Sequence, residues 1–365
     1  MKHRILQDYL QGWFPILSKW NGRIAVIDGF AGPGQYLSKD TPGQFEPGSP
    51  VIIIDTVLGH KLRDRFAEIV LLFIEKNPVY ASYLERLLQE KYPPASLGKI
   101  KYAIVKGNFA ATMQMILSYI RQSNTHMVPC FAFIDPFGPG GIPMRLIGQF
   151  MENPSSEVLI NFAFDIVNRR LNVPQYETTL DDLYGCGEWR EIRKIRDKAQ
   201  RHQLLHELYV GQLKAVAGAR YVLSFTMRDG KNRALYHLVF GSKNHKGLDL
   251  MKQTMWRADP SGSFQFSDYR YNPAQMVFFP PTPDYEALAG LIWAEFHSRK
   301  VGVEEVERWV VTDTDRYAST HVRKALTIIE DQGKLQKYRR DGEPGEKPRK
   351  HAFPPGTVIH FAGTD

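Results

Sequence analysis

Two short motifs in this sequence combine carboxylate, glycine and aromatic residues at spacings that suit a cofactor and its reaction. The first runs over residues 28–34 and directly follows the apolar run 24–27. The second runs over residues 135–138 and follows the apolar run 130–134. Because each apolar run has the length of a buried strand, we expect both motifs at strand ends, where α/β proteins bind ligands.

The first motif has the form D-x-x-x-G-x-G. Its glycines allow positive φ and a close approach of the backbone to a ligand. Backbone N–H groups in such a loop suit the carboxylate of an amino-acid-like cofactor, and Asp28 is placed to meet its ammonium group. A tight strand-to-helix turn without a ligand is the alternative. The candidate cofactor-binding residues here are Asp28, Gly29, Phe30, Ala31, Gly32 and Gly34.

Two further strand ends carry residues that could complete a cofactor site. Glu75, followed by Lys76, ends the run 69–74, and a carboxylate there can accept hydrogen bonds from two ribose hydroxyls. Its separation from Asp28 exceeds the about 20 residues of dinucleotide folds, and we explain the excess as a loop inserted at 35–48. Asn108, followed by Phe109, could bind an adenine amino group while the ring packs on the base, or could cap a helix.

The second motif, Asp135-Pro136-Phe137-Gly138, could act on an acceptor amine. A carboxylate and a backbone carbonyl that accept its N–H groups would aim its lone pair at a methyl sulfonium. Phe137 can stack on a planar base, an interaction worth about 1–3 kcal/mol. We therefore predict that these four residues are catalytic, and the alternative is an Asp-Pro turn with a core phenylalanine.

The segments around these motifs alternate between strand and helix patterns. Helical spacing of apolar residues marks the first 20 residues, and Ser49-Pro50 is a typical helix start, for a helix that should reach about Arg63. Such alternation predicts a parallel sheet with helices on both faces. We expect strands at 24–28, 69–75, 102–105, 130–135 and 158–162, and helices near 80–88, 113–120 and 144–151.

A long basic helix is expected at 189–216, facing either phosphate groups or solvent. Two alternating segments follow, at 221–227 and 234–240, joined by the hairpin signal at 229–232. A hairpin that closes a parallel sheet predicts an α/β, Rossmann-like class I methyltransferase domain, with a mostly parallel seven-stranded sheet and an antiparallel final strand. A dehydrogenase half-domain would not need this hairpin.

The C-terminal part has the outline of a winged helix-turn-helix domain. Helices are expected near 285–298, 303–311 and 317–331, followed by strands at 335–339 and 357–361 around a Gly- and Pro-rich wing. We predict a methyltransferase-like domain over 1–257, a linker over 258–283 and a winged-helix domain over 284–365. Winged helices bind nucleic acid or dock proteins. The candidate nucleic-acid-binding residues are Arg316, His321, Arg323, Lys324, Arg339 and Arg340.

Length and composition limit the number of domains and the kinds of partner that the chain can have. With 365 residues the chain is long enough for about two domains. Its net charge of +8 favours a polyanionic partner, and the excess lies before Asp284. The apolar run 51–54 and the longer run 69–74 are both far too short for a membrane span. The N-terminus does not have the pattern of a signal peptide, so we expect a cytoplasmic protein. Cys130 and Cys186 give no zinc spacing, and no metal is expected.

The combination of these pieces resembles the three-Cys-motif partner (TcmP) family. The matching segments are the N-terminal helix with Tyr9 and Trp13, the two motifs above, 48–50, 73–75, 107–109, the hairpin 221–240 and Met255-Trp256. Locally, residues 135–138 are also similar to the catalytic loop of tRNA guanine-N2 dimethyltransferases. The resemblance implies a Rossmann-like methyltransferase domain that uses S-adenosyl-L-methionine (SAM), and a radical-SAM-like partner protein that bears three cysteines.

We therefore expect a SAM-dependent methyltransferase acting on an amino nitrogen, most readily that of a nucleic-acid base in DNA or RNA. Oxygen or a peptide amine stays open as the acceptor. The alternative is a non-catalytic or SAM-sensing adaptor that docks a radical-SAM-like protein or DNA through its winged helix. An NAD-dependent dehydrogenase leaves residues 135–138 and the late hairpin unexplained.

Overall fold

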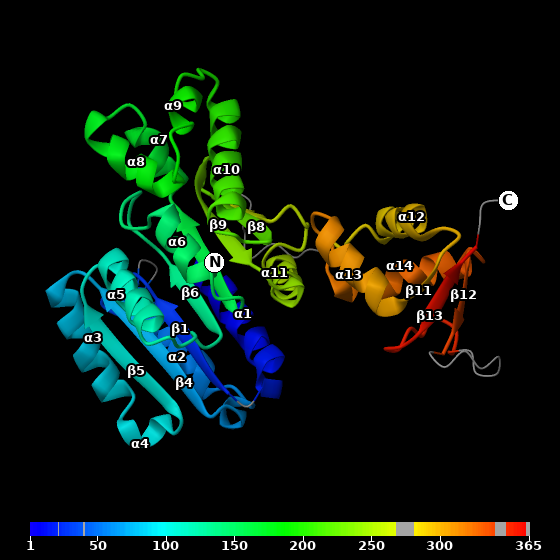
Figure 1. Ribbon diagram of the computed structural model, residues 1–365, viewed down its shortest axis with the longest axis horizontal. Coiled ribbons are helices and arrows are strands. Elements are labelled where there is room, and N and C mark those ends of the chain that lie inside the picture. Colours follow the sequence, from blue (N-terminus) through cyan, green and yellow to red (C-terminus); the bar gives the residue numbers. More distant parts are fainter. Residues whose placement is uncertain (21, 39–40, 268–280, 340–347, 363–365) are drawn as a thin grey trace. The chain divides into compact units, whose positions relative to one another are not determined.

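The architecture comes from a computed structural model that describes residues 1–20, 22–38, 41–267, 281–339 and 348–362 (Figure 1). These residues form two compact units. The first comprises residues 1–247 and 265–267, and the second comprises residues 248–264 together with the described residues from 281 onward. The predicted domain boundaries stay a prediction, and part of the predicted linker lies outside the described residues.

The first unit is built on one mixed sheet of eight strands. Five of them, β5, β4, β1, β6 and β7, lie side by side and parallel, whereas β9 runs antiparallel to both of its neighbours, β7 and β8. In order across the sheet the strands are β10 (Gln265–Ser267), β8 (Tyr221–Arg228), β9 (Ala234–Ser242), β7 (Ser156–Phe162), β6 (Cys130–Ile134), β1 (Arg23–Asp28), β4 (Glu68–Glu75) and β5 (Ile100–Lys106).

This strand order confirms the predicted α/β fold of the Rossmann-like methyltransferase type, because the last hairpin inserts its second strand beside β7. One detail was wrong: β10 pairs with β8 and adds an eighth strand to the predicted seven. The central strands β6 and β7 are buried along their whole length, as expected for parallel strands covered on both faces.

Helices cover both faces of the sheet (Figure 1). Ala132 and Ile134 of β6 face a core shared with α5 (Phe109–Gln122), α6 (Met144–Met151) and α10 (Lys198–Ala215). Phe131, the residue before Ala132, packs on the other face against α1 (Lys2–Leu17), where its ring centroid lies 5.1 Å from that of Tyr9. The alternation along one strand therefore fixes which helices lie on which side.

Three predicted segments differ from the structure. The helix α2 (Ser49–Leu58) ends before Arg63. The expected helix over 189–216 is two helices, α9 (Trp189–Ile192) and α10, because the side chain of Asp197 accepts a hydrogen bond from the backbone of Gln200 and starts a new helix. The segment after β7, where no helix was expected from the sequence, forms α7 (Phe164–Arg170) and then α8 (Glu177–Tyr184).

The remaining elements of this unit lie in its connections. The predicted insertion at 35–48 contains a two-stranded antiparallel ribbon. These connecting elements are the helix α3 (Pro78–Lys91) and the short elements β2 (Gln35–Leu37), β3 (Phe45–Pro47), α4 (Pro94–Leu97) and the 3₁₀ turns at Ser18–Trp20, Arg63–Arg65 and Pro174–Tyr176. The helix α11 (His245–Ala258) follows β9 and continues into the second unit.

The second unit contains three helices and a small antiparallel sheet. The helices are α12 (Tyr285–Phe296), α13 (Val303–Asp313) and α14 (Ser319–Asp331). The sheet has the order β11 (Lys300–Gly302), β13 (Val358–Phe361) and β12 (Leu335–Tyr338), of which β11 was not predicted. Leu288, Ile292, Val306, Leu326 and Phe361 form part of its own buried core.

Residues of α11 hold the connection between α13 and α14. The buried ammonium of Lys252 donates hydrogen bonds to the backbone oxygens of Val311, Thr314 and Tyr317. Asp249 accepts hydrogen bonds from the backbone N–H and the hydroxyl of Ser319, at 2.8 and 2.6 Å, and so caps α14. Across the described residues, no helix combines the length and the apolar character that a membrane span needs.

Candidate cofactor and acceptor site

The loops after β1, β4, β5 and β6 line one cavity of about 990 Å³. The carboxyl ends of parallel strands meet at one edge of the sheet, and the chain reverses its direction of winding between β1 and β6, so a crevice opens there. The lining residues are Gly29, Phe30, Glu75, Lys76, Asn77, Pro78, Tyr80, Gly107, Asn108, Phe109, Pro136, Phe137, Gly138, Gly140 and Gly141. Four separately predicted motifs thus meet at one place, and Asn77, Tyr80 and Gly141 are additions that the sequence did not single out.

The glycine loop takes the conformation for which glycine is needed. Gly32 and Gly34 have φ of 63° and 84°, a region that residues with a side chain seldom adopt. The backbone oxygen of Gly34 accepts a hydrogen bond from Gly48 at 2.7 Å, and Ala31 is buried and donates to the backbone oxygen of Ile74 at 2.9 Å. The loop is therefore fixed to the starts and ends of its neighbouring elements.

Glu75 is buried at the cavity wall, and both of its carboxylate oxygens accept a backbone N–H. Oε2 accepts from Gly32 at 2.8 Å and Oε1 accepts from Asn77 at 2.6 Å. A carboxylate offers about four lone-pair positions, so each oxygen can accept one hydrogen bond more. Glu75 thus holds the glycine loop to the end of β4 and can also accept two hydroxyl groups from a ligand.

Asp28 is fully buried at the end of β1 and is only partly satisfied. Its Oδ1 accepts from the backbone N–H of Phe30 at 3.2 Å, whereas Oδ2 has no hydrogen-bond partner among the described residues. Burial raises the pKa of Asp28 to about 7. An unpaired buried carboxylate oxygen is costly, and a cationic ligand group would satisfy it.

Asn108 and Phe109 begin α5 at the cavity. The Oδ1 atom of Asn108 accepts the backbone N–H of Ala111 at 2.8 Å and caps the helix, but its second lone pair allows it to accept from a ligand as well. The Phe109 ring lies with its centroid 5.6 Å from that of Phe30. It also packs so closely on Gly29 that a Cβ at that position would lie 2.6 Å from Cδ2. The two rings make an apolar wall for a planar group.

Asp135 lies immediately before the lining residue Pro136. Its Oδ1 accepts from Asn161 Nδ2 at 2.6 Å, and its Oδ2 accepts from the ammonium of Lys2. Phe137 is 78% exposed at the cavity, so the interpretation of this ring as a core residue is wrong. Lys2 lies 133 positions from Asp135 along the chain, and no local pattern in the sequence indicated that the two meet.

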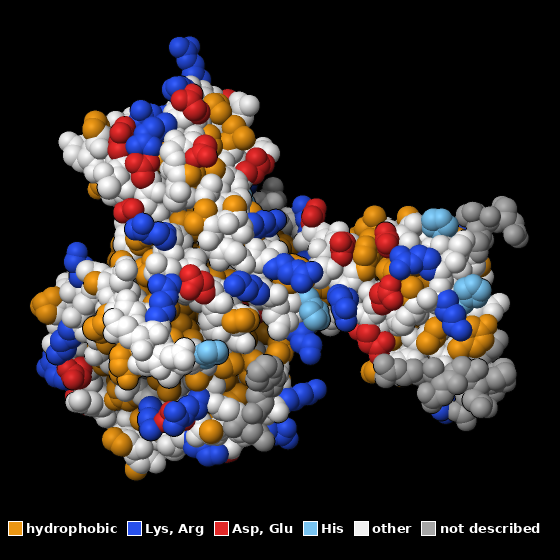
Figure 2. Space-filling view, viewed as in Figure 1, with side chains coloured by type: hydrophobic (Ala, Val, Ile, Leu, Met, Phe, Trp, Pro, Cys, Tyr) orange, Lys and Arg blue, Asp and Glu red, His pale blue; other side chains and the backbone are white. Residues whose placement is uncertain are grey.

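Three of the six bases in the run that begins at Trp189 pair with acidic neighbours. Arg190 donates to Asp181 at 2.8 Å, and Arg193 donates to Glu177 at the same distance. Lys194 pairs with Glu191 at 2.7 Å. In Figure 2, basic and acidic side chains accordingly lie side by side over α8 and α9. The three paired bases therefore offer little uncompensated charge to a phosphate backbone.

In the second unit, the predicted nucleic-acid-binding residues have different environments. Arg316, Arg323, Lys324 and Arg339 are exposed, whereas His321 is buried and its Nδ1 accepts the backbone N–H of Ala318. Lys324 lies over the ring of Tyr285, with Nζ 4.8 Å from the centroid. Arg340 lies outside the described residues.

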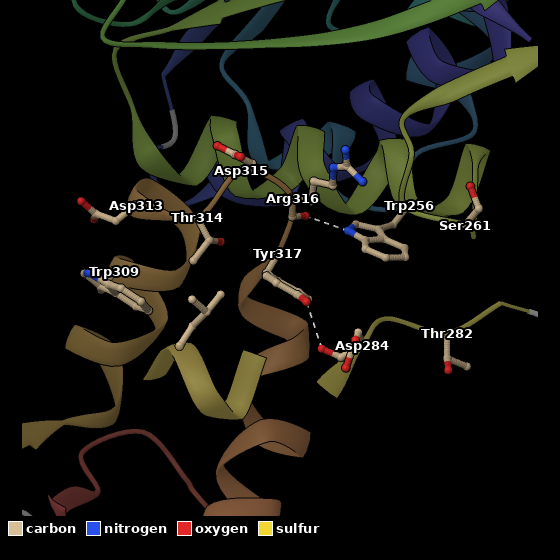
Figure 3. A pocket seen from close by; sticks show the side chains of 12 residues that line it. Trp256, Ser261, Thr282, Asp284, Trp309, Asp313, Thr314, Asp315, Arg316 and Tyr317 are labelled. Atoms are coloured by element: carbon tan, nitrogen blue, oxygen red, sulfur yellow. Dashed lines mark hydrogen bonds between the residues drawn. The ribbon is translucent and has the colours of Figure 1, made fainter. Parts of the chain in front are cut away.

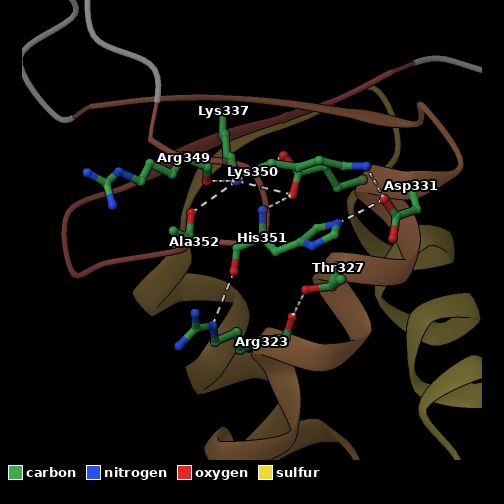
Figure 4. A network of polar contacts seen from close by, with 9 residues as sticks. Arg323, Thr327, Asp331, Lys337, Arg349, Lys350, His351 and Ala352 are labelled. Atoms are coloured by element: carbon green, nitrogen blue, oxygen red, sulfur yellow. Dashed lines mark hydrogen bonds and ion pairs between the residues drawn. The ribbon is translucent and has the colours of Figure 1, made fainter.

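A polar network ties α14 to the segment before β13 (Figure 4). The buried Lys337 pairs with Glu330 at 2.9 Å and donates to two backbone oxygens, those of Arg349 and Ala352. Asp331 pairs with both Lys350 and His351. Several bases near the predicted wing are therefore engaged within the unit.

A second cavity, of about 550 Å³, lies within this unit between α11, α13 and the start of α14 (Figure 3). Trp256 Nε1 donates to the backbone oxygen of Arg316 at 2.8 Å, and the Tyr317 hydroxyl donates to that of Asp284 at 3.0 Å. Its lining mixes aromatic rings with Asp313, Asp315 and Arg316. Within the described part of the chain, no group of three or more His, Cys, Asp or Glu residues could hold a metal ion.

No protein-family model matches the sequence, and no curated protein matches it. Among solved structures, the protein LPL1258 of Legionella pneumophila, of family DUF519, is similar over 69% of this chain and 90% of its own, at 12% identity and a TM-score of 0.40. Trm1 of Pyrococcus horikoshii in complex with S-adenosyl-L-methionine is similar over 98% of this chain and 90% of its own, at 13% identity and a TM-score of 0.36.

A caffeoyl-CoA O-methyltransferase from Staphylococcus aureus is similar over 65% of this chain and 82% of its own, at 13% identity and a TM-score of 0.30. TM-scores below 0.5 do not establish a common fold, so the fold assignment rests on the strand order. The resemblance to the three-Cys-motif partner family stays a prediction.

Proposed function

We propose that this protein is a SAM-dependent methyltransferase that acts on an amino nitrogen of a nucleic-acid base. The observation that carries the proposal is the cavity at the switch point of the sheet, which the buried carboxylate Glu75 and the exposed ring of Phe137 line. Asp28 directly precedes the lining residue Gly29, and its buried Oδ2 has no hydrogen-bond partner among the described residues. Each group matches a different part of SAM or of a planar acceptor.

In this proposal the first three strand ends bind the cofactor. Asp28 Oδ2 accepts the ammonium of the methionine moiety, and the cofactor carboxylate lies along the loop 29–34. The backbone N–H groups of residues 29–32 already donate within the protein and hold the shape of this loop. Glu75 accepts the two ribose hydroxyls with its remaining lone pairs. Phe30 and Phe109 border the adenine, and Asn108 accepts its amino group. Lys76 lies beside Glu75 at the cavity wall.

SAM supplies a methyl group on a positively charged sulfur, so the protein mainly has to position the acceptor. Asp135 and the Pro136 carbonyl accept the N–H groups of the acceptor and hold its lone pair in line with the methyl carbon. Phe137 stacks on the acceptor base, and Gly138 leaves room beside it. Bound SAM would supply the methyl group and keep the electron pair of the broken C–S bond on its sulfur, and Asp135 or solvent would take up the proton that the acceptor nitrogen releases.

For the second unit we propose a winged helix-turn-helix domain, with α14 as the helix that faces nucleic acid. The order of three helices and a small antiparallel sheet supports it, and Arg323 and Lys324 project from α14 as exposed bases. Arg316 and Arg339 would contact phosphate groups at its two ends.

A second candidate function is a SAM-sensing adaptor that docks a radical-SAM-like protein of the kind the TcmP resemblance implies. The observation that favours it is the pairing of Lys337 and Lys350 with acids of their own unit, which leaves fewer bases for phosphates. Tight SAM binding without methyl transfer to any nucleic acid or lysate protein would support the adaptor.

The cofactor claim is tested by calorimetry with S-adenosylhomocysteine. Glu75→Ala removes two hydrogen bonds to a charged group, each worth about 1.5–3 kcal/mol, and should weaken binding at least roughly 100-fold. Glu85→Ala, which removes a half-exposed glutamate paired with Lys106, is the control and should bind normally. Absence of binding to the unaltered protein at high micromolar ligand would contradict the cofactor claim.

The acceptor claim is tested with radiolabelled SAM and total cellular nucleic acid. Asp135→Ala should abolish label transfer while S-adenosylhomocysteine still binds. If the substitution also abolished binding, Asp135 would have a structural role rather than a catalytic one.

A further inference from the structure

The geometry points to Lys2 as a specificity-determining residue of the acceptor site. Together with Asp135, Lys2 recognises an amino group that lies next to an unprotonated ring nitrogen. This inference rests on the proposed function and narrows its substrate class to a neutral aromatic amine, such as the amino edge of adenine, cytosine or guanine. Lys2 belongs to none of the predicted motifs.

Lys2 and Asp135 form a partly buried ion pair at the end of β6, with exposed side-chain fractions of 23% and 18%. The ammonium donates to Asp135 Oδ2, while Asn161 Nδ2 donates to Oδ1 at 2.6 Å. The Lys2 ammonium also lies 5.9 Å from the ring centroid of Tyr236. The pair is thus held from three elements: α1, β7 and β9.

The carboxylate keeps capacity for an acceptor while Lys2 stays in place. Two of its about four lone-pair positions are used by Asn161 and Lys2, which leaves Asp135 able to accept an amino N–H. Asn161 Oδ1 is buried and has no hydrogen-bond partner among the described residues, so a further acceptor lies beside the carboxylate. An ammonium has three N–H donors, and Lys2 can direct one to the acceptor molecule.

The site offers a hydrogen-bond donor, the Lys2 ammonium, next to a hydrogen-bond acceptor, the Asp135 carboxylate. A matching substrate must present an acceptor to Lys2 and a donor to Asp135. An exocyclic amino group beside a ring nitrogen with a free lone pair presents that pattern, as nucleobases do at their edges. The amino group donates to Asp135, and the ring nitrogen accepts from Lys2. Phe137, one residue beyond Pro136, supplies the ring on which such a flat molecule stacks.

The same pair disfavours a lysine or arginine side chain as the acceptor. A cationic acceptor would bring a second positive charge next to the Lys2 ammonium in a partly buried place, where like charges repel strongly. The neighbouring His3 does not add to this positive charge, because burial and the charge of Lys2 lower its pKa to about 4, so it stays neutral at physiological pH. The positive charge near Asp135 therefore belongs to Lys2.

The experiment compares the unaltered protein with Lys2→Met and Lys2→Arg, on single-stranded oligoribonucleotides that contain adenine, cytosine or guanine as the sole amino base. Each oligonucleotide has a partner in which the ring nitrogen is replaced by carbon: 1-deazaadenine, 3-deazacytosine or 3-deazaguanine. Label transfer from SAM gives kcat and KM, a lysine-rich peptide serves as the cationic acceptor, and S-adenosylhomocysteine calorimetry checks that each variant is folded.

On the base that is methylated, Lys2→Met should lower kcat/KM roughly 10- to 100-fold, the size of one base-edge contact, whereas Lys2→Arg should retain most of it. With the deaza analogue as substrate, kcat/KM of the unaltered protein should fall by a similar factor. The kcat/KM of Lys2→Met should not fall further, because that variant already lacks the same hydrogen bond. Unchanged affinity for S-adenosylhomocysteine is expected throughout.

Three outcomes overturn the inference. Equal losses for Lys2→Met on natural and deaza bases mean that Lys2 has a structural role. Full activity of Lys2→Met on nucleic acid removes Lys2 from the site but leaves the proposed function intact. Methyl transfer to the peptide, or to no nucleic acid at all by the unaltered protein, overturns the inference together with the proposed acceptor.

Discussion

At the scale of single residues, Asp28 and Glu75 show how two buried carboxylates at neighbouring strand ends differ. Glu75 is satisfied by two backbone N–H groups, whereas Asp28 keeps one oxygen without a partner among the described residues. The Glu75 carboxylate is part of the hydrogen-bonded loop, whereas the Asp28 carboxylate can still bind a ligand cation. This difference makes Asp28 the residue whose protonation should respond to cofactor binding.

Cofactor affinity should therefore depend on pH through Asp28. Its pKa of about 7 in the free protein, raised by burial, means that the carboxyl must lose a proton to pair with the ligand ammonium. S-adenosylhomocysteine affinity should fall by up to about tenfold per pH unit below pH 7 and level off above it. Calorimetry between about pH 6 and pH 8 measures this, and Asp28→Asn should bind weakly with no such dependence.

The same shift affects the stability of the free protein in a defined direction. The folded pKa of Asp28 lies above its ordinary value of 3.8, so the folded state holds the proton more tightly. The stability that this provides is complete below about pH 4 and is lost as pH rises through about 7. Urea unfolding without ligand should show this loss in the unaltered protein but not in Asp28→Asn.

Phe137 should contribute to acceptor binding and not to cofactor binding. The exposed ring is available for stacking, and loss of one stacked base costs about 1–3 kcal/mol. Phe137→Ala should raise KM for a nucleic-acid acceptor roughly tenfold or more, and Phe137→Trp should restore it. A Phe137→Ala protein with unaltered KM would show that the base lies elsewhere.

Residue-scale prediction from sequence succeeded where chemistry is local. Asp28, the glycines and Glu75 stand directly at the ends of apolar runs, so their place at the sheet edge follows from the strands alone. Lys2 could not be found this way, because its contact with Asp135 forms only when α1 packs on the sheet. His321, counted from sequence as an exposed base, is buried under the start of α14.

At the scale of elements, the loop 29–34 depends on a close approach to α3. A Cβ on Gly34 would lie 2.6 Å from Leu84 Cδ1, whereas one on Gly43 would meet no atom within 4 Å. Both glycines have φ near 80°, at 84° and 82°. A substitution at Gly43 therefore tests backbone strain alone, whereas a substitution at Gly34 tests backbone strain together with steric contact.

Gly43→Ala should cost about 1–2 kcal/mol of unfolding free energy from its left-handed backbone alone. Gly34→Ala should cost more, because Leu84 and Leu87 have to move, and it should weaken S-adenosylhomocysteine binding by shifting the loop. Urea unfolding and calorimetry measure the two effects. Equal behaviour of the two variants would mean that the contact with α3 does not shape the loop.

Elements with a strong apolar pattern were predictable, and short or polar ones were not. The helix α6 has the predicted bounds of 144–151, because its apolar residues follow the helical period closely. β10 and β11 are three residues long, too short to carry a period. The basic stretch that splits into α9 and α10 has no clear apolar face, so the cap at Asp197 was the one local signal of the break.

At the scale of the whole molecule, the net charge of +8 predicts salt-dependent binding to nucleic acid. If α14 faces the phosphate backbone, the double substitution Arg323→Ala and Lys324→Ala should lower the salt slope for a short DNA duplex by about 2. The matched control removes two exposed bases that are ion-paired, Arg169 and Lys194, and should change the slope little. Fluorescence anisotropy over a salt series measures the slope for each double variant. Equal slopes for the α14 variant and the control variant would argue against α14 as the contact.

The overall organisation followed from the order of patterns along the chain. Strand and helix alternation gives the parallel half of the sheet, and the late hairpin at 229–232 gives its antiparallel closure. The eventual place of the hairpin, with β9 and not β8 next to β7, is set by pairing between distant segments and was expected only from the fold type.

The insertion of β9 between β7 and β8 has a consequence for folding of the chain during its synthesis on the ribosome. β7 is buried along its whole length in the finished sheet, yet its outer edge pairs with a strand that is synthesised after four further helices. Until then a nascent chain carries a bare, apolar strand edge of the kind that recruits other strands. Translation pauses or chaperone shortage at that stage should send this protein into inclusion bodies more readily than stress applied after release.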